Sequence, residues 1–196
     1  MNIQNRKNMK NKRSNRSSNG KNTEFYIVYT VVFLLIALFL YLRFYLNGKS
    51  LVWSHDGVPQ HLNSLSYYGR YLRGILYTIF VEHRFSIPMW DLHIGYGSDI
   101  LTTLHYYVIG DPLTLLSVFC PSSKTEILYE FLIFLRIYLA GIAFSRYCFY
   151  HKNSRQATFM GCMIYIFAGW TIYAAMKHPY FSNPMIYLPL ILMGID

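Results

Sequence analysis

The sequence predicts an all-α integral membrane protein, a multi-pass helical bundle with a long helical loop after its first span. Two observations favour this class. Hydrophobic residues make up 54% of the 196 residues and charged residues only 14%, against roughly 25% charged in soluble domains. Apolar runs long enough to cross a bilayer also recur along the chain. So small a share of charge cannot cover a soluble surface.

The N-terminal segment 1–24 is predicted to be a disordered, basic, cytoplasmic tail. Seven of the 18 Lys and Arg residues lie before residue 22, in a stretch rich in Asn and Ser. Its few apolar residues cannot support a core. The formal net charge of +9 raises nucleic-acid binding as an alternative, but no aromatic residues interleave with these charges. We therefore expect no nucleic-acid partner.

The first transmembrane helix is expected at 25–46, because "FYIVYTVVFLLIALFLYL" carries no charge and is longer than the apolar core of a signal peptide. The other expected segments are an outside loop at 47–126, a second span at 127–150, a cytoplasmic link at 151–155, a third span at 156–176, an outside link at 177–184 and a truncated fourth span at 185–196. A chain that stops within a span indicates an N-terminal fragment of a longer protein.

Basic residues set the predicted orientation. The tail and the link "HKNSR" both carry Lys or Arg, and such segments stay on the cytoplasmic side. If the spans alternate, both assignments place the N-terminus in the cytoplasm and the long loop outside.

The long loop should contain helices of its own. Apolar residues recur at steps of three and four over residues 59–80, which predicts an amphipathic helix lying along the membrane surface. Asn63, Arg70, Arg73 and Tyr77 fall on its polar face. The stretch "GDPLTLLSVFCP" predicts a second, short helix, with Asp111 as N-cap, Pro112 in the first position and Pro121 after its end.

Several separate motifs carry a resemblance to a known family. They are "WSHDGVPQHL", "IPMWDLHIGYGSD", "LHYYVIGDPLTLLSVFCP", "LRIYLAGIAFS" and "KHPYFSNPMIYLPL". Together they resemble the start of the YfhO family of bacterial multi-pass proteins, regarded as membrane glycosyltransferases of the GT-C type. The resemblance implies a GT-C bundle in the bacterial cell membrane. It also implies sugar transfer from a polyprenyl-phosphate carrier to a cell-envelope polymer, such as teichoic acid, on the outer face of the membrane.

Asp56 is the candidate catalytic residue. In GT-C enzymes an acidic residue lies in the first outside loop just after the first helix, and Asp56 occupies that position. A carboxylate there can take the proton that an acceptor hydroxyl loses as it attacks the anomeric carbon. The alternative is a purely structural turn, since "HDG" is good turn sequence.

Other polar residues are candidates for substrate binding. The set is His55, Gln60, His61, His105, Asp111, Lys177 and His178. Lys177 and His178 could hold the carrier phosphate, although a lone Lys beside aromatic residues also suits an interfacial anchor. Asp111 could equally serve only as a helix cap.

Arg136 lies well inside the second span, where an ionisable group is costly and is usually paired or functional. Glu130 is six residues away and on another face of the helix. The partner of Arg136 is therefore expected on another element. It is either an acidic residue of the loop, giving a structural ion pair, or a lipid phosphate.

No cofactor is identified. A divalent cation is compatible with the chemistry but not required, and no metal site is assigned to His55, Asp56 and His61 or to Asp91 and Asp99, which lack a paired spacing. Three cysteines without CxxC spacing give neither a disulfide framework nor a zinc site. The expected partners are the polyprenyl-phosphate-linked sugar, the polymer and the lipid bilayer. The rival functions are a transporter or flippase of lipid or polysaccharide, and a non-enzymatic membrane assembly protein.

Overall fold

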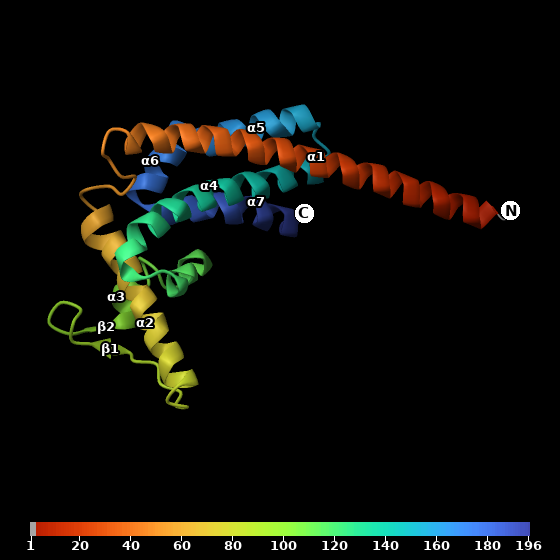
Figure 1. Cartoon of the computed structure of the whole chain (residues 1–196). Coiled ribbons are helices and arrows are strands. Elements are labelled where there is room, and N and C mark those ends of the chain that lie inside the picture. Colours follow the sequence, from red (N-terminus) through yellow and green to blue (C-terminus); the bar gives the residue numbers. More distant parts are fainter. Residues whose placement is uncertain (1–2) are drawn as a thin grey trace.

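The computed structural model describes residues 3–196, with side chains described from Asn22 onward. It consists of helices apart from one very short hairpin (Figure 1). The helices of the bundle are α1 (Ile3–Tyr45), α4 (Thr125–Tyr150), α5 (Arg155–Phe167), α6 (Gly169–Lys177) and α7 (Asn183–Ile195). The predicted all-α membrane class is confirmed. Within the described residues, two helices are long and apolar enough to cross a membrane, or three if α5 and α6 form one span.

Figure 1 shows where the connections between these helices lie. The segment between α1 and α4 and the short link after α6 lie at the same end of the bundle, which we call the loop end. The link between α4 and α5 lies at the opposite end, where Arg155 pairs with Glu24 at 3.9 Å. The two links predicted to be outside therefore share one end of the bundle.

The structure differs from the sequence prediction at the N-terminus. Helix α1 begins at Ile3, although residues 1–24 were expected to be disordered. Figure 1 shows this part of α1 projecting beyond the other helices. Continuing an existing helix costs far less than nucleating a new one, and the tail contains no Pro to stop it. Residues 1 and 2 lie outside the described part.

The predicted third span, 156–176, is not one straight helix. It breaks at Ala168, whose backbone is extended, and α5 and α6 meet at a bend of 43°. A break inside a membrane must have its backbone groups satisfied by protein. The Thr171 hydroxyl supplies one such contact, donating a hydrogen bond of 3.1 Å to the carbonyl oxygen of Tyr165.

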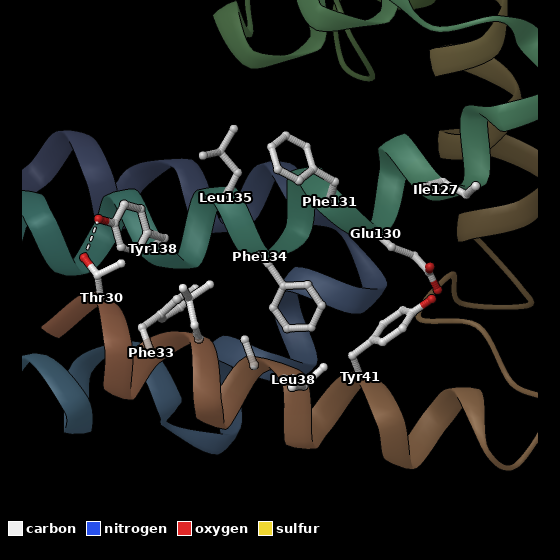
Figure 2. A pocket seen from close by; sticks show the side chains of 12 residues that line it. Thr30, Phe33, Leu38, Tyr41, Ile127, Glu130, Phe131, Phe134, Leu135 and Tyr138 are labelled. Carbon is white, nitrogen blue, oxygen red and sulfur yellow. Dashed lines mark hydrogen bonds between the residues drawn. The ribbon is translucent and has the colours of Figure 1, made fainter. Parts of the chain in front are cut away.

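Helices α1 and α4 approach closely through aromatic hydroxyls. The Tyr29 hydroxyl donates to the backbone oxygen of Tyr138 at 2.9 Å, and the Tyr138 hydroxyl lies 2.9 Å from Thr30 Oγ1 (Figure 2). Gly141 leaves room for the Tyr29 ring, because a Cβ at this position would collide with the Tyr29 hydroxyl.

An apolar groove of about 470 Å³ runs along the same pair of helices (Figure 2). Its walls include Phe33, Leu38 and Phe134, with Thr30 and Tyr138 toward one end and Tyr41 and Glu130 toward the other. None of the predicted site residues lines it.

Glu130 fastens the start of the loop to α4. Its Oε1 accepts hydrogen bonds from Ser50 Oγ at 3.1 Å and from the Leu51 amide at 2.9 Å. Because Leu51 and Val52 are themselves buried, the chain is held against the bundle immediately before the predicted catalytic turn.

The loop contains the expected helices together with additional elements. They are a π-helical turn (Gly57–Leu62), α2 (Asn63–Phe80), β1 (Trp90–Asp91) paired with β2 (Ser98–Asp99), α3 (Ile100–Leu104), and 3₁₀ helices at Pro112–Phe119 and Ser122–Lys124. Figure 1 shows α2 running across the direction of the bundle at the loop end. This orientation suits the predicted helix along a membrane surface.

One residue of the predicted polar face of α2 turns inward. The Arg73 guanidinium donates to the backbone oxygens of Ser117, Val118 and Cys120 at 3.0, 3.2 and 2.7 Å. It thus satisfies the carbonyls at the end of the 3₁₀ helix. Gly69 permits the close approach, because a Cβ there would lie 2.6 Å from the Ser117 oxygen. Helical periodicity alone places Arg73 on the outer face and does not reveal this partner.

The predicted cap of the second loop helix is confirmed, although the helix is 3₁₀ and not α. Asp111 Oδ1 accepts a hydrogen bond of 2.9 Å from the Leu113 amide, and Pro112 follows in the first position. Thr114 fixes the same turn through hydrogen bonds of 2.7 Å to the backbone oxygens of Val108 and Asp111.

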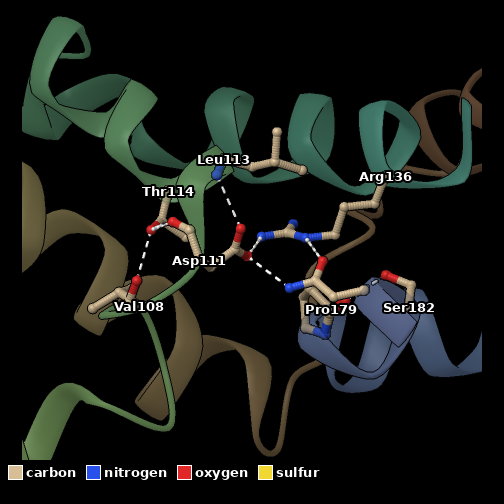
Figure 3. Close-up of polar contacts among 8 residues, drawn as sticks. Val108, Asp111, Leu113, Thr114, Arg136, Pro179 and Ser182 are labelled. Atoms are coloured by element: carbon tan, nitrogen blue, oxygen red, sulfur yellow. Dashed lines mark hydrogen bonds and ion pairs between the residues drawn. The ribbon is translucent and has the colours of Figure 1, made fainter. Parts of the chain in front are cut away.

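The other oxygen of Asp111 ties this helix to the bundle (Figure 3). Arg136 Nη2 lies 2.6 Å from Asp111 Oδ2, and both side chains are almost fully buried, at 2% and 6% exposed. Asn183, at the start of α7, joins both partners: its Oδ1 accepts from Arg136 Nε at 3.1 Å and its Nδ2 donates to Asp111 Oδ2 at 3.1 Å. The expected partner of Arg136 is therefore an acidic residue of the loop.

Replacing Arg136 by Met should destabilise the protein by about 3–5 kcal/mol, because Asp111 would remain buried without its counter-charge. We expect Asp111→Asn in the same background to recover part of this loss. Denaturant unfolding of the detergent-solubilised protein measures both changes. Arg146→Met is the matched control, since Arg146 lies exposed on the same helix. Equal losses for Arg136→Met and Arg146→Met would contradict a structural role for the ion pair.

Candidate functional site

Asp56 lies where the chain leaves α1 at the loop end and enters the π-helical turn. Its backbone oxygen accepts from the Gln60 and His61 amides at 3.2 and 3.3 Å. Its carboxylate makes no capping hydrogen bond. The turn is therefore built by the backbone of Asp56, and the side chain is not consumed in forming it. This distinguishes Asp56 from Asp99 and Asp111, whose carboxylates both accept capping hydrogen bonds.

The imidazole of His178, which follows α6, lies beside the Asp56 carboxylate. Asp56 Oδ2 lies 3.7 Å from His178 Nε2. The other carboxylate oxygen lies 3.5 Å from Gln60 Nε2, a long contact. Residues more than 120 positions apart in the sequence therefore meet at the loop end, as the motifs "SHDGVPQH" and "KHPYF" led us to expect for one membrane face.

A second histidine continues this contact into the core. His178 Nδ1 lies 3.0 Å from His61 Nε2, and His61 is completely buried. The direction of this hydrogen bond depends on the tautomers of the two rings. Asp56, His178 and His61 are thus in contact in series, and the hydrogen bond with His61 restrains the His178 ring.

The surroundings of His61 keep it uncharged. Burial, reinforced by repulsion from His178 and Arg136, lowers the pKa of His61 to about 4, although Asp56 acts in the opposite direction. The rings of Tyr107 and Tyr180 lie against it, with centroids at 5.3 and 5.6 Å. Its Nδ1 is buried without a hydrogen-bond partner among the described residues. A neutral His61 adds no positive charge next to Asp56.

Lys177 lies beside this cluster and contacts two aromatic rings. Its ammonium lies 5.9 Å from the Trp53 ring centroid and 5.6 Å from that of Tyr173, and it donates to the Tyr173 hydroxyl at 3.2 Å. No carboxylate pairs with it among the described residues. The aromatic contacts suit both an interfacial anchor and a cation kept available for an anion.

The remaining predicted binding residues are more scattered. Gln60 Oε1 accepts from the Tyr107 hydroxyl at 3.1 Å, which keeps it at the edge of the cluster. His55 is exposed and contacts Ser54 Oγ at 3.2 Å. The His105 ring is engaged 2.6 Å from the backbone oxygen of Thr102, and no contact joins it to Asp56 within the described structure.

Asp111, for which both a cap and a binding role were considered, has the contacts of a helix cap and of a buried ion pair. Arg136, Asn183 and the Leu113 amide occupy its carboxylate, and it is only 7% exposed. Asp111 therefore has a structural role, and its carboxylate is not part of the cluster of Asp56, His178 and His61. Tyr180 links the two regions, because the Arg136 guanidinium lies 5.3 Å from its ring centroid and its ring faces His61.

Among the described residues, no group of three or more His, Cys, Asp or Glu side chains is arranged to hold a metal ion. The combination His55, Asp56 and His61 does not converge, since Asp56 and His61 are joined through His178 and His55 contacts Ser54.

Sequence reasoning identified both histidines but not their mutual contact. It also missed the supporting roles of Tyr107, Tyr180 and Asn183. The last two belong to the quoted motif "KHPYFSNP", so the signal lay in a compact polar and aromatic link between two spans. No periodicity argument brings such a link next to a turn more than 110 residues earlier.

The pH dependence of stability tests the environment of His61. Its folded pKa of about 4 lies below its ordinary value of 6.5, so the unfolded chain binds a proton in this window and the folded chain does not. Stability should therefore fall by up to about 3 kcal/mol as the pH drops from 6.5 to 4. Melting curves of wild type and His61→Asn should show that the variant has lost this part of the slope. An unchanged slope would assign the effect to other groups.

Comparison with known proteins identifies the family of this chain. The model of the bacterial membrane protein YfhO matches residues 28–196. No curated protein matches significantly, and no solved structure does so either. The match covers all the bundle helices from within α1 onward and the whole loop, including Asp56, His61 and His178. The chain therefore belongs to the YfhO family of bacterial membrane proteins.

Proposed function

We propose that the protein is a membrane glycosyltransferase that moves a sugar from a polyprenyl-phosphate carrier to a cell-envelope polymer, such as teichoic acid. Membership of a bacterial membrane family is compatible with this role. The observation that carries the proposal is the Asp56 carboxylate, which lies at the loop end of a membrane span, free of capping contacts and beside His178.

The proposed reaction is a single displacement at the anomeric carbon. The acceptor oxygen forms the new bond to that carbon, and the bond between the carbon and the carrier phosphate breaks. The acceptor proton passes to an Asp56 oxygen, and polyprenyl phosphate leaves with the bonding electron pair. A single displacement inverts the configuration of the sugar.

His178 is proposed to position Asp56. Its Nε2 lies 3.7 Å from Asp56 Oδ2, and its own orientation is restrained by the hydrogen bond with His61. Because the Asp56 carboxylate forms no capping hydrogen bond, its oxygens are open to an acceptor hydroxyl.

Lys177 is proposed to hold the carrier phosphate. It is the last residue of α6 and directly precedes His178, and no carboxylate of the described residues pairs with its ammonium. A cation here would stabilise the charge that grows on the phosphate as the bond breaks. The proposal places the loop end at the outer face, with the N-terminus in the cytoplasm, in agreement with the basic character of the opposite end.

The two rival functions predict a different place for the polar groups. A transporter or flippase usually binds its ligand near the middle of the membrane on broken helices. The break at Ala168 is such a feature. However, Thr171 satisfies the backbone oxygen of Tyr165 beside the break. The cluster of ionisable residues lies instead at the loop end. A non-enzymatic assembly protein needs no unengaged carboxylate at Asp56.

Asp56→Asn should lower the rate of sugar transfer by about 100-fold or more, because a general base typically contributes a factor of 10²–10⁴. The test compares the sugar content of teichoic acids and other envelope glycans from wild-type, deletion and Asp56→Asn strains with matched membrane levels of the protein. Loss of the same sugar in the deletion and Asp56→Asn strains is the expected result.

Asp99→Asn is the control for this experiment, since Asp99 caps α3 and Asn caps equally well. Sugar lost on deletion but retained in Asp56→Asn would remove Asp56 from the chemistry. Full sugar content in the deletion strain would reject transferase activity toward these polymers and favour the transporter or assembly function.

A further inference from the structure

We propose that a pocket beside α2 binds a stretch of a polyol-phosphate or sugar-phosphate chain. This inference rests on the proposed function, for which it would supply the acceptor site. The pocket has a volume of about 610 Å³ and lies between one face of α2 and the segment that leads into and through the hairpin. It shares no lining residue with the Asp56 cluster.

Tyrosine hydroxyls fix the pocket in shape. Tyr67 donates to Asp91 Oδ2 at 2.5 Å, and Tyr71 donates to the backbone oxygen of Pro88 at 2.8 Å. The two rings stack with centroids 6.3 Å apart. These contacts join α2 to the hairpin segment at two points, so the pocket exists before any ligand arrives and binding need not order it.

Asp91 supplies a permanent negative charge with room for a hydroxyl donor. Hydrogen bonds from Tyr67 and from the backbone and ring of His93 lower the pKa of Asp91 to about 2. Its Oδ1 accepts both bonds from His93, each at 2.8 Å, whereas among the described residues Oδ2 accepts only from Tyr67. A carboxylate has about four acceptor positions, so Oδ2 can still accept from a ligand hydroxyl.

Arg70 supplies an uncommitted guanidinium in the same pocket. It is exposed, and it makes no hydrogen bond or ion pair among the residues that the structure describes. The other loop arginines differ: Arg73 is occupied by three carbonyls, and Arg84 pairs with Glu82 at 3.0 Å. A planar, unpaired guanidinium is well suited to bind a phosphate through two parallel hydrogen bonds.

Trp90 adds an apolar surface beside these charges. Its side chain is 61% exposed although it lines the pocket. Gly97 lies beneath its edge with φ +107°, and a Cβ there would lie 3.1 Å from the Trp90 Nε1. The glycine therefore allows the indole to rest against the hairpin while its other side remains open. An exposed indole offers apolar area with a polar edge.

These groups together define the class of ligand. The guanidinium of Arg70 suits phosphate groups, the free acceptor position of Asp91 suits hydroxyl groups, and the indole of Trp90 suits C–H faces. A chain that carries all three kinds of group therefore matches the pocket. A lipid tail would bury Asp91 unfavourably. The pocket runs along α2 from Tyr67 to Thr78, about 16 Å at the rise of an α-helix, which is long enough for several units of a polymer. Helix α2 follows directly from the turn that bears Asp56, so one chain could reach both.

The test measures binding of a synthetic glycerol-phosphate hexamer to the purified full-length protein in detergent. We expect Arg70→Gln and Trp90→Ala each to raise the Kd by about tenfold or more. Arg84→Gln is the matched control and should leave the Kd unchanged. Circular dichroism and melting temperature check that every variant is folded.

Several results would overturn the proposal. They are no binding by the wild-type protein, an unchanged Kd in folded Arg70→Gln and Trp90→Ala, or equally tight binding of inorganic phosphate, which would indicate only a point charge. The comparison of envelope sugar between the wild-type and deletion strains separates this proposal from the proposed function. Intact hexamer binding with no dependence of envelope sugar on the protein would reject the transferase and keep the pocket, and the reverse pattern would reject the pocket alone.

Discussion

The buried charge of Arg136 is the constraint around which the molecule is organised. A guanidinium inside an apolar bundle is tolerated only with a counter-charge and with its donors satisfied. Asp111 and Asn183 meet both needs. Since Asp111 belongs to the loop, Arg136 to α4 and Asn183 to the start of α7, one polar cluster fixes the loop against the bundle and α7 against α4 (Figure 3).

The position of the candidate site follows from this anchor. Asn183 ends the 3₁₀ turn that begins just after His178, so holding Asn183 limits where His178 can lie. Glu130 restrains the other side by binding the chain at Ser50 and Leu51, six and five residues before Asp56. The two halves of the Asp56–His178 contact thus come from segments that α4 fixes separately, through Arg136 and through Glu130. A separation of 3.7 Å between flexible side chains can then be maintained.

Patterns of hydrophobicity and local capping rules predicted much of the fold. The two long apolar helices, the helix along the loop end, the cap at Asp111 and the need of Arg136 for a partner on another element all follow from residues close in sequence or from the cost of a buried charge. The break at Ala168 did not, because it depends on Thr171 replacing a lost backbone partner. The inward turn of Arg73 depends on a 3₁₀ helix that approaches over Gly69. Both are tertiary contacts that leave no periodic signal, and the same holds for the contact between His61 and His178.

Enclosed cations and open cations of the chain differ in their partners, and this difference is relevant to function. Where a guanidinium is enclosed, as at Arg136 and Arg73, carboxylate, amide or carbonyl oxygens of the protein satisfy it. Where a cation faces open space at the loop end, as at Lys177 and Arg70, the described residues offer it aromatic or tyrosine neighbours and no carboxylate partner. Under the proposed function these two cations have separate uses: Lys177 would bind the carrier phosphate and Arg70 a phosphate of the acceptor, so each needs to be free of a carboxylate partner.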